Sequence, residues 1–258
     1  MKFFLSLFCF LFIITICSTA QQATDKYREA VQLKNESRFT ESLVLFKDLV
    51  KSDSLNLDYL CNASYLFSKT GNIFADESSR KNYFNTARYL SQKAIAINPN
   101  FAAAHYTYAL SLGRLNENAS NKEKLANAKL IKSECDKALQ LDPKNANVYH
   151  ILGRWHRTIA SFGVFEKLAI NTMFGGMPQG GSYENAIDCF LKSVQLDPSF
   201  ILHYYELALS YHERGKKGDD IYAKVWLQRA LLLSKNPSDP DDANTRKKCE
   251  ELLAKVSS

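Results

Sequence analysis

The sequence predicts an all-α solenoid of about five helical hairpins, with an inserted helix and a capping helix at the C-terminal end. Three phrases of nearly the same sequence recur, and each closes with Asn-Pro or Asp-Pro: Lys93-Ala-Ile-Ala-Ile-Asn-Pro99, Lys137-Ala-Leu-Gln-Leu-Asp-Pro143 and Lys192-Ser-Val-Gln-Leu-Asp-Pro198. Six residues after each proline stands a histidine or a tyrosine: His105, Tyr149 and Tyr204. Such self-similarity is typical of stacked helical hairpins, which present a binding surface rather than a catalytic pocket.

We expect residues 1–20 to be a secretory signal peptide and residues 21–258 to be a single helical-repeat domain. A lysine precedes an almost wholly apolar run, and small residues stand before position 21, as at a cleavage site. The apolar run is shorter than the ~20 residues that span a membrane. Cys17 could carry a lipid, but Ile16 stands where lipid-attachment signals place a small residue. These features predict an exported protein, periplasmic or extracellular, with no lipid anchor and no transmembrane segment in its mature chain.

Each predicted hairpin has apolar or small residues spaced i, i+3, i+4 and i+7 on two successive helices. The positions that carry this pattern are, from the first pair to the fifth, Tyr27, Ala30, Phe39, Ser42, Phe46 and Leu49; Tyr59, Ala63, Leu66, Ala87 and Ala94; His105, Tyr108, Ala109, Leu112, Ile131, Cys135 and Ala138; Tyr149, Leu152, Gly153, His156, Ala186, Phe190 and Ser193; and Tyr204, Leu207, Ala208, Tyr211, Ala223, Leu227 and Ala230. A terminal helix over about residues 241–256 has one apolar face and is the expected cap of the array.

The fourth pair shows why small residues recur at set positions. Gly153 and Ala186 allow the two helices to approach closely, while Tyr149 and Phe190 fill the space between them. The first helix has a large residue, Leu, Gly and an aromatic residue in register, and the second has Ala, Phe, a small residue and Pro. This combination resembles the tetratricopeptide repeat.

Residues 162–182 are predicted to be an insertion within the fourth pair. The prolines that close the third and fourth pairs are 55 residues apart, whereas the repeat has a period of ~34. The preceding interval is 44 residues, which predicts one long helix over residues 122–141. Five of the ten glycines flank an apolar segment of the insertion, which includes Phe165, Leu168 and Phe174. Stacking does not require this segment, so it is a candidate wall of a binding site; the alternative is that it packs as additional core.

Four motifs follow one another around the insertion: His150-Ile-Leu-Gly-Arg-Trp-His156, Met173-Phe-Gly-Gly-Met-Pro178, Ser182-Tyr-Glu-Asn-Ala-Ile-Asp-Cys-Phe-Leu-Lys192 and Leu196-Asp-Pro198. In this order they resemble the regulator of microtubule dynamics protein family, over roughly residues 80–233. The resemblance implies a helical-repeat protein. Animal members are associated with microtubules, spindle poles and mitochondria, and one with membrane contact sites and phospholipid binding. Because an exported protein does not meet microtubules, the two observations together predict a bacterial envelope relative that shares the fold and its groove.

Binding is predicted in a concave groove lined by the first helices of successive pairs. The inward positions are Tyr106, Asn147, His150, Arg154, Arg157, Tyr205 and His212. Arginine and aromatic groups at one site suit a carboxylate, a phosphate or a peptide backbone. The alternatives are an ordinary solvated groove, or an Arg154 that pairs with a nearby carboxylate and holds the insertion in place. Trp155 points to the other side of the same helix and is expected to pack in the core.

The sequence favours a non-enzymatic scaffold that binds a protein or peptide partner in this groove. Binding of a lipid or a small amphiphile beneath the insertion is the alternative. No H-E-x-x-H, G-x-S-x-G or phosphate-binding glycine loop is present, and we expect no cofactor and no metal. The 33 Lys and Arg and the 27 Asp and Glu are spread along the chain, so no nucleic-acid partner is expected.

Four cysteines outside the signal peptide are expected to be mostly free thiols, with disulfides as the alternative; they are Cys61, Cys135, Cys189 and Cys249.

Overall fold

The structure is a computed structural model, and it describes residues 21–74, 76–116, 119–163, 166, 172, 176, 178–236 and 239–257. Residues 21–35 are helical, and the elements that follow are α2 (Phe39–Ser52), α3 (Leu57–Thr70), the short 3₁₀ helix η1 (Gly71–Ile73), α4 (Glu77–Ile97), α5 (Ala102–Leu115), α6 (Asn121–Leu141), α7 (Ala146–Ser161), α9 (Tyr183–Leu196), α10 (Ile201–Arg214), α11 (Asp219–Leu232) and α12 (Pro240–Lys255). Within the described ranges there is no β-strand, and no helix has the length and apolar character needed to cross a membrane. The predicted signal peptide over residues 1–20 lies outside these ranges and stays a prediction.

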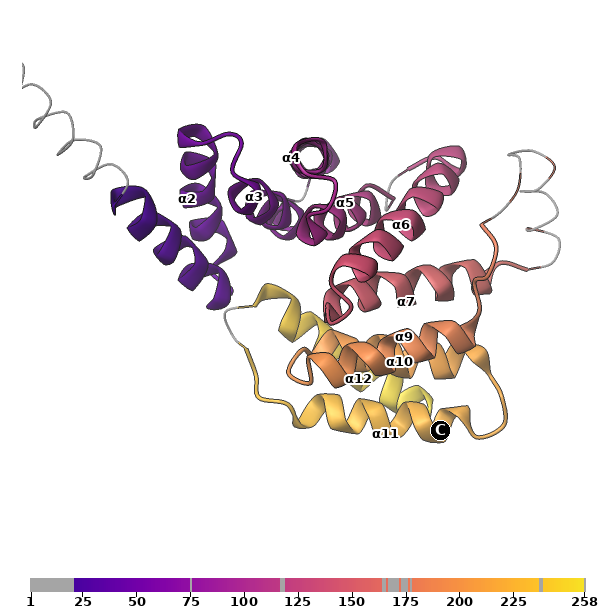
Figure 1. The fold of residues 1–258 in the computed structure, drawn as a ribbon. Coiled ribbons are helices and arrows are strands. Elements are labelled where there is room, and N and C mark those ends of the chain that lie inside the picture. Colours follow the sequence, from indigo (N-terminus) through magenta and orange to yellow (C-terminus); the bar gives the residue numbers. More distant parts are fainter. Residues whose placement is uncertain are drawn as a thin grey trace, which may run out of the picture.

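The described helices pair into five hairpins that stack into an array (Figure 1). The helix over residues 21–35 pairs with α2, α3 with α4, α5 with α6, α7 with α9, and α10 with α11. The last described helix, α12, packs against both helices of the fifth hairpin. The predicted all-α solenoid is confirmed, and the capping helix runs over Pro240–Lys255 instead of the predicted 241–256.

The three recurring phrases form the turns between hairpins. The Asn or Asp before each proline accepts a hydrogen bond from the backbone N–H two residues further on; the pairs are Asn98 with Asn100 (2.9 Å), Asp142 with Lys144 (3.2 Å) and Asp197 with Ser199 (3.1 Å). The side chain six residues after the proline donates to the proline carbonyl; the pairs are His105 with Pro99 (2.9 Å), Tyr149 with Pro143 (3.3 Å) and Tyr204 with Pro198 (2.9 Å). The sequence repeat is therefore a repeat of hydrogen bonds that fixes where each first helix begins.

The fourth hairpin is packed as closely as its small residues predict. A Cβ atom at Gly153 would lie 2.8 Å from the Phe190 ring of α9, which is closer than two carbon atoms approach in a packed core. Trp155 is 5% exposed, and its indole donates to the Ala128 carbonyl of α6 at 2.8 Å. Trp155 is thus a core residue, as its position on α7 indicated.

Two of the second helices, α4 and α6, project beyond the packed core. Each has 21 residues, whereas α9 and α11 have 14, so the long helix predicted over residues 122–141 is confirmed. Among the side chains whose burial is described, the first buried ones are Phe84 in α4 and Ile131 in α6. A capping box between Ser120 and Glu123 stabilises the projecting start of α6. These first turns are consequently available to line a site of their own.

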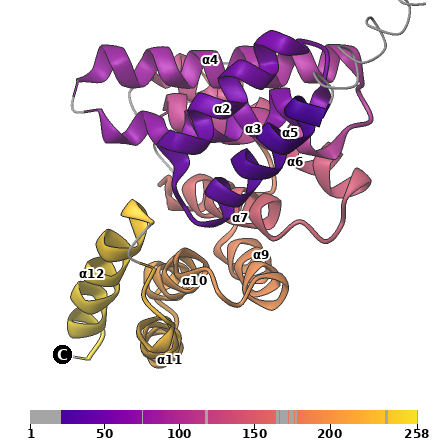
Figure 2. The same ribbon diagram turned by 90° about the vertical axis from the view of Figure 1, so that its left-hand side faces the viewer.

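The connection that precedes α12 reaches back to the N-terminal hairpins. Asn236 donates to Ser37 Oγ at 3.2 Å. The ammonium of Lys69 on α3 lies 2.8 Å from Asp241 and 4.0 Å from Asp239. Figure 2 shows the first turn of α12 directed toward the N-terminal helices. The array is thus held together by contacts between neighbouring hairpins and also by this long-range contact.

Candidate functional site

The residues of the predicted groove lie on first helices, but the structure gives them different surroundings. Two of them, Asn147 and Arg154, are exposed on α7. They are seven residues apart, so they occupy one face of the helix about two turns from each other. Among the described residues, the side-chain amide of Asn147 has no hydrogen-bond partner. These two side chains are the members of the predicted set that offer donors to a ligand.

A buried carboxylate on α10 organises the arginines of α7. The Glu206 side chain is 7% exposed; it accepts a hydrogen bond from Arg157, and its other oxygen lies 3.5 Å from Arg154 Nε. Arg157 also pairs with Glu213 at 3.3 Å and is 14% exposed, so it forms a structural link between α7 and α10. Arg154 is 52% exposed and meets no carboxylate other than Glu206 in the described part of the chain. The sequence left open a pairing of Arg154 with a carboxylate that would hold the insertion in place. The carboxylate that Arg154 meets, Glu206, lies on α10 and not in the insertion, and the Arg154 side chain stays accessible.

His150 does not face a groove, contrary to the prediction. It is 8% exposed, its Nδ1 lies 2.9 Å from Nδ1 of His203 on α10, and its ring meets the Phe190 ring edge-on at 5.5 Å. Burial lowers the pKa of His150 well below its usual value, and burial lowers the pKa of His203 to about 4. The rings are therefore a neutral buried pair at neutral pH. Position 150 lies on the edge of α7 that the next hairpin covers, which a pattern within one helix does not show.

The other three residues of the predicted groove are partly buried. Tyr106 lies beside Tyr65 of α3 with ring centroids 6.4 Å apart, and burial raises the pKa of Tyr106 well above its usual value. Tyr205 packs at the edge of the apolar cluster formed by α10, α11 and α12. His212 pairs with Asp220 at 2.7 Å. These three side chains are thus engaged in contacts within the protein, whereas Asn147 and Arg154 are exposed.

The side chains predicted to form the insertion wall lie outside the described residues; they are Phe165, Leu168 and Phe174. The end of the insertion is described. The carbonyl oxygen of Gly180 accepts hydrogen bonds from His156 Nδ1 of α7 at 3.1 Å and from the Asn185 amide of α9 at 3.0 Å. This end of the insertion is therefore fastened to both helices of the fourth hairpin.

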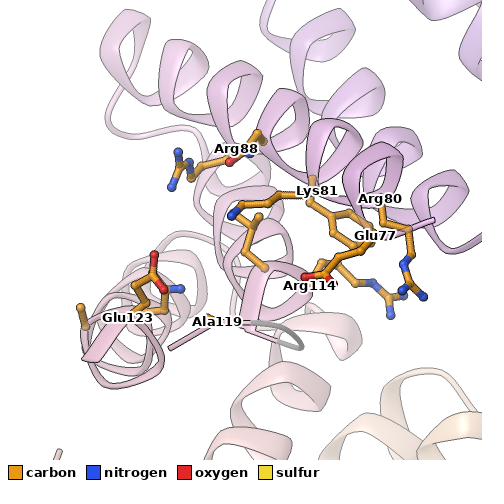
Figure 3. Close-up of a pocket in the computed structure, with 12 residues that line it drawn as sticks. Glu77, Arg80, Lys81, Arg88, Arg114, Ala119 and Glu123 are labelled. Carbon is orange, nitrogen blue, oxygen red and sulfur yellow. The ribbon is translucent and has the colours of Figure 1, made fainter. Parts of the chain in front are cut away.

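A cavity of about 350 Å³, here called the α4–α6 cavity, lies between the projecting first turns of α4 and α6 (Figure 3). Its charged lining consists of four cations and two carboxylates: Arg80, Lys81 and Arg88 of α4, Arg114 of α5, Glu77 of α4 and Glu123 of α6. None of the predicted site residues lies in this cavity. Lys81, Phe84 and Arg88 do share one face of α4 at i, i+3 and i+7, which is a signal for it. The opposite wall comes from α5 and α6, and no spacing within α4 indicates that wall.

The described residues contain no group of three His, Cys, Asp or Glu side chains that could hold a metal ion. The four cysteines are free thiols, as the sequence favoured. Burial raises the pKa values of Cys61, Cys189 and Cys249 to about 12. These thiols are therefore protonated at neutral pH and act as small apolar side chains in the packing.

Comparisons with known proteins agree with this architecture. A sequence model of the family described as regulator of microtubule dynamics protein 1-3 matches residues 20–257. Regulator of microtubule dynamics protein 1 of Bos taurus is 32% identical over 124 residues, which are 48% of this chain and 39% of that protein. Regulator of microtubule dynamics protein 2 of Rattus norvegicus is 27% identical over 211 residues, which are 81% of this chain and 50% of that protein. The chain thus spans half or less of the length of these relatives.

Among solved structures, a thermophilic tetratricopeptide-repeat protein of Thermus thermophilus resembles the whole array. The TM-score is 0.65 at 16% sequence identity, and the match covers 90% of this chain and 99% of that one. At this identity the likeness shows the shared fold. The hairpins identified above are therefore tetratricopeptide-like in their arrangement as well as in their residue pattern.

Proposed function

Because the chain belongs to the regulator of microtubule dynamics protein 1-3 family and folds as a tetratricopeptide-like array, we propose that it is a non-enzymatic scaffold. Its ligand in this proposal is a protein or peptide partner, bound along the inner side of the array on the first helices. The family and the fold support the scaffold role. In this proposal the partner contacts α7.

The observation that carries the proposal is the setting of Arg154. Its side chain is 52% exposed, yet its Nε lies 3.5 Å from Glu206, a carboxylate that is 7% exposed and also accepts from Arg157. Glu206 restrains the Arg154 side chain and reduces the conformational entropy that a ligand would otherwise have to overcome. A guanidinium held in this way suits a carboxylate of a partner peptide, because its planar fork matches the two oxygens.

Asn147 extends the same face of α7 toward its N-terminus. An asparagine side chain can donate to a backbone carbonyl and accept from a backbone N–H of an extended peptide. Two helical turns span about 11 Å, and three extended residues span about 10 Å. An extended segment can therefore place a backbone amide at Asn147 and a carboxylate at Arg154 without bending.

The test is selection of peptides from a random displayed library on the full chain, followed by calorimetric measurement of affinity for the selected peptides. We expect acidic peptides, and we expect Arg154→Ala to weaken their binding about tenfold or more, because a charge-assisted contact contributes about 1.5–3 kcal/mol. Asn147→Ala should give a smaller loss.

Lys129→Ala is the matched control, because it removes one exposed positive charge from α6 and leaves the side chains of α7 unchanged. Circular dichroism of each variant should show unchanged helical content and an unchanged melting temperature. Arg154→Ala protein that binds the selected peptides as tightly as the wild type would contradict the proposed site. Unfolding of Arg154→Ala would show that Arg154 is structural, and the proposal would then fail as well.

A further inference from the structure

The α4–α6 cavity points to a second binding site, and we propose that it binds a small phosphate monoester. This site is separate from the peptide site, because its walls come from α4, α6 and the end of α5, whereas Asn147 and Arg154 lie on α7. The inference therefore does not depend on the proposed function.

Two of the four cations that line the cavity have no carboxylate partner among the residues that the structure describes. Lys81 and Arg88 form no ion pair with any residue in the described ranges, and the Nε of Arg80 is buried without a hydrogen-bond partner. Of the two carboxylates, Glu123 is occupied by the helix cap, where it accepts hydrogen bonds from the Ser120 backbone and hydroxyl at 2.9 and 2.7 Å. An anion in the cavity would supply the missing acceptors, so the lining selects for negative charge.

Lys81 and Arg88 bring two positive charges to the same end of the cavity, which favours a phosphate dianion over a singly charged carboxylate. In Figure 3 the side chains of Arg80 and Arg114 run to one end of the cavity, and that of Lys81 extends toward the other end, where Arg88 lies. A phosphate monoester presents three acceptor oxygens in a tetrahedral array and carries nearly two negative charges at neutral pH. A carboxylate presents two oxygens in one plane, so it reaches donors on fewer sides.

The remaining lining residues and the volume of the cavity limit the size and polarity of the organic group that the phosphate can carry. Phe84 and Leu115 contribute apolar wall, and Asn85 and Asn127 contribute amide groups. The volume of about 350 Å³ lies at the lower end of the ~300–1,000 Å³ of small-molecule sites. The cavity therefore fits a phosphate that carries one ring or a short chain, and a free small ester suits it better than a phosphorylated polypeptide segment.

Titration of the full chain with phenyl phosphate tests this inference, because this probe combines a phosphate dianion with one apolar ring. We expect the wild type to bind phenyl phosphate about tenfold or more tightly than benzoate, which has the same ring and one fewer charge. Lys81→Ala and Arg88→Ala should each weaken binding of phenyl phosphate about tenfold. Both side chains are exposed, so their removal leaves the packed core unchanged.

Two controls separate this site from general electrostatic attraction and from the peptide site. Lys129→Ala removes the same charge from α6 outside the cavity, and Arg154→Ala removes the proposed peptide contact; both should bind phenyl phosphate as the wild type does. A short peptide containing phosphotyrosine should bind more weakly than phenyl phosphate. The inference is overturned if the wild type does not bind phenyl phosphate, if benzoate or the phosphopeptide binds equally well, or if Lys129→Ala weakens binding as much as Arg88→Ala.

Discussion

At Gly153 a single added carbon atom would meet the Phe190 ring, because α7 and α9 approach each other there without an intervening side chain. The new Cβ would lie 2.8 Å from two ring atoms of Phe190, which is 0% exposed and has no free space to move into. We expect Gly153→Ala to lower the free energy of unfolding by about 1–3 kcal/mol, as overpacked core positions do. Urea unfolding followed by circular dichroism measures this change.

Gly113 provides the matched control, because it is also a helical glycine but a Cβ there would have no atom within 4 Å. Gly113→Ala should raise the free energy of unfolding by up to about 1 kcal/mol, through the better helix propensity of alanine. The same Gly→Ala substitution is thus expected to lower the free energy of unfolding at position 153 and to raise it at position 113. A Gly153→Ala protein as stable as the wild type would show that the α7–α9 contact is looser than described.

Single residues also show what a sequence can predict. The Asn or Asp before a proline, and the tyrosine six residues after it, act within one turn, so their spacing revealed the hairpins; Asp197 and Tyr204 are one such pair. The partner of Arg157 is Glu206, 49 residues away, and their contact depends on how the fifth hairpin stacks on the fourth. No local spacing encodes that stacking, so the groove residues could be placed on helices but not matched to their partners.

At the scale of elements, the His150–His203 pair joins α7 to α10 and makes this junction sensitive to pH. The Nδ1 atoms are 2.9 Å apart, which requires at least one ring nitrogen of the pair to be unprotonated, and Arg154 and Arg157 also disfavour a charged His150. In the unfolded chain histidines take up protons near pH 6.5. The free energy of unfolding should therefore fall as the pH falls from about 6.5 to about 4, by about 3 kcal/mol from His203 alone.

Denaturant unfolding at pH 7 and at pH 5 checks this expectation in wild type and in His203→Gln, which cannot gain a proton. We expect the loss of stability between the two pH values to be smaller in His203→Gln. His212→Gln is the control, because His212 pairs with Asp220 outside the core and should leave the pH dependence close to that of the wild type. Equal losses in wild type and His203→Gln would contradict the role assigned to the buried pair.

The α4–α6 cavity depends on the lengths of two helices and on how their hairpins pack together. The extra length of the helix over residues 122–141 could be predicted from the interval between prolines, because helix length is a local property. The hollow between α4 and α6 could not be predicted, because it depends on how the second and third hairpins pack on each other.

At the scale of the whole molecule, an ideal solenoid has contacts only between neighbouring repeats, and each end can then unfold independently. This array has an additional contact between residues 172 positions apart, Lys69 of α3 and Asp241 of α12. The Lys69 side chain is 9% exposed, and its ammonium also lies 5.0 Å above the Phe39 ring, so it is withdrawn from water and needs its partner. The contact should therefore couple the stability of the N-terminal hairpins to that of the capping helix.

A double-mutant cycle with Lys69→Met and Asp241→Asn measures this coupling, and we expect a coupling free energy of about 1 kcal/mol or more. The exposed Lys132–Asp136 pair of α6 is the control; its atoms are 2.6 Å apart, but its residues are four apart on one helix, so we expect only about 0.3–0.5 kcal/mol. Hydrogen exchange gives a second measurement, because loss of a purely local ion pair in α12 would not change amide exchange in the distant helix α3. Asp241→Asn should speed amide exchange in α3 as well as in α12, because both ends lose the same restraint. The proposed coupling is contradicted if exchange rises in α12 alone, or if the coupling free energy is no larger than that of the control pair. The N-terminal hairpins and the capping helix would then unfold independently.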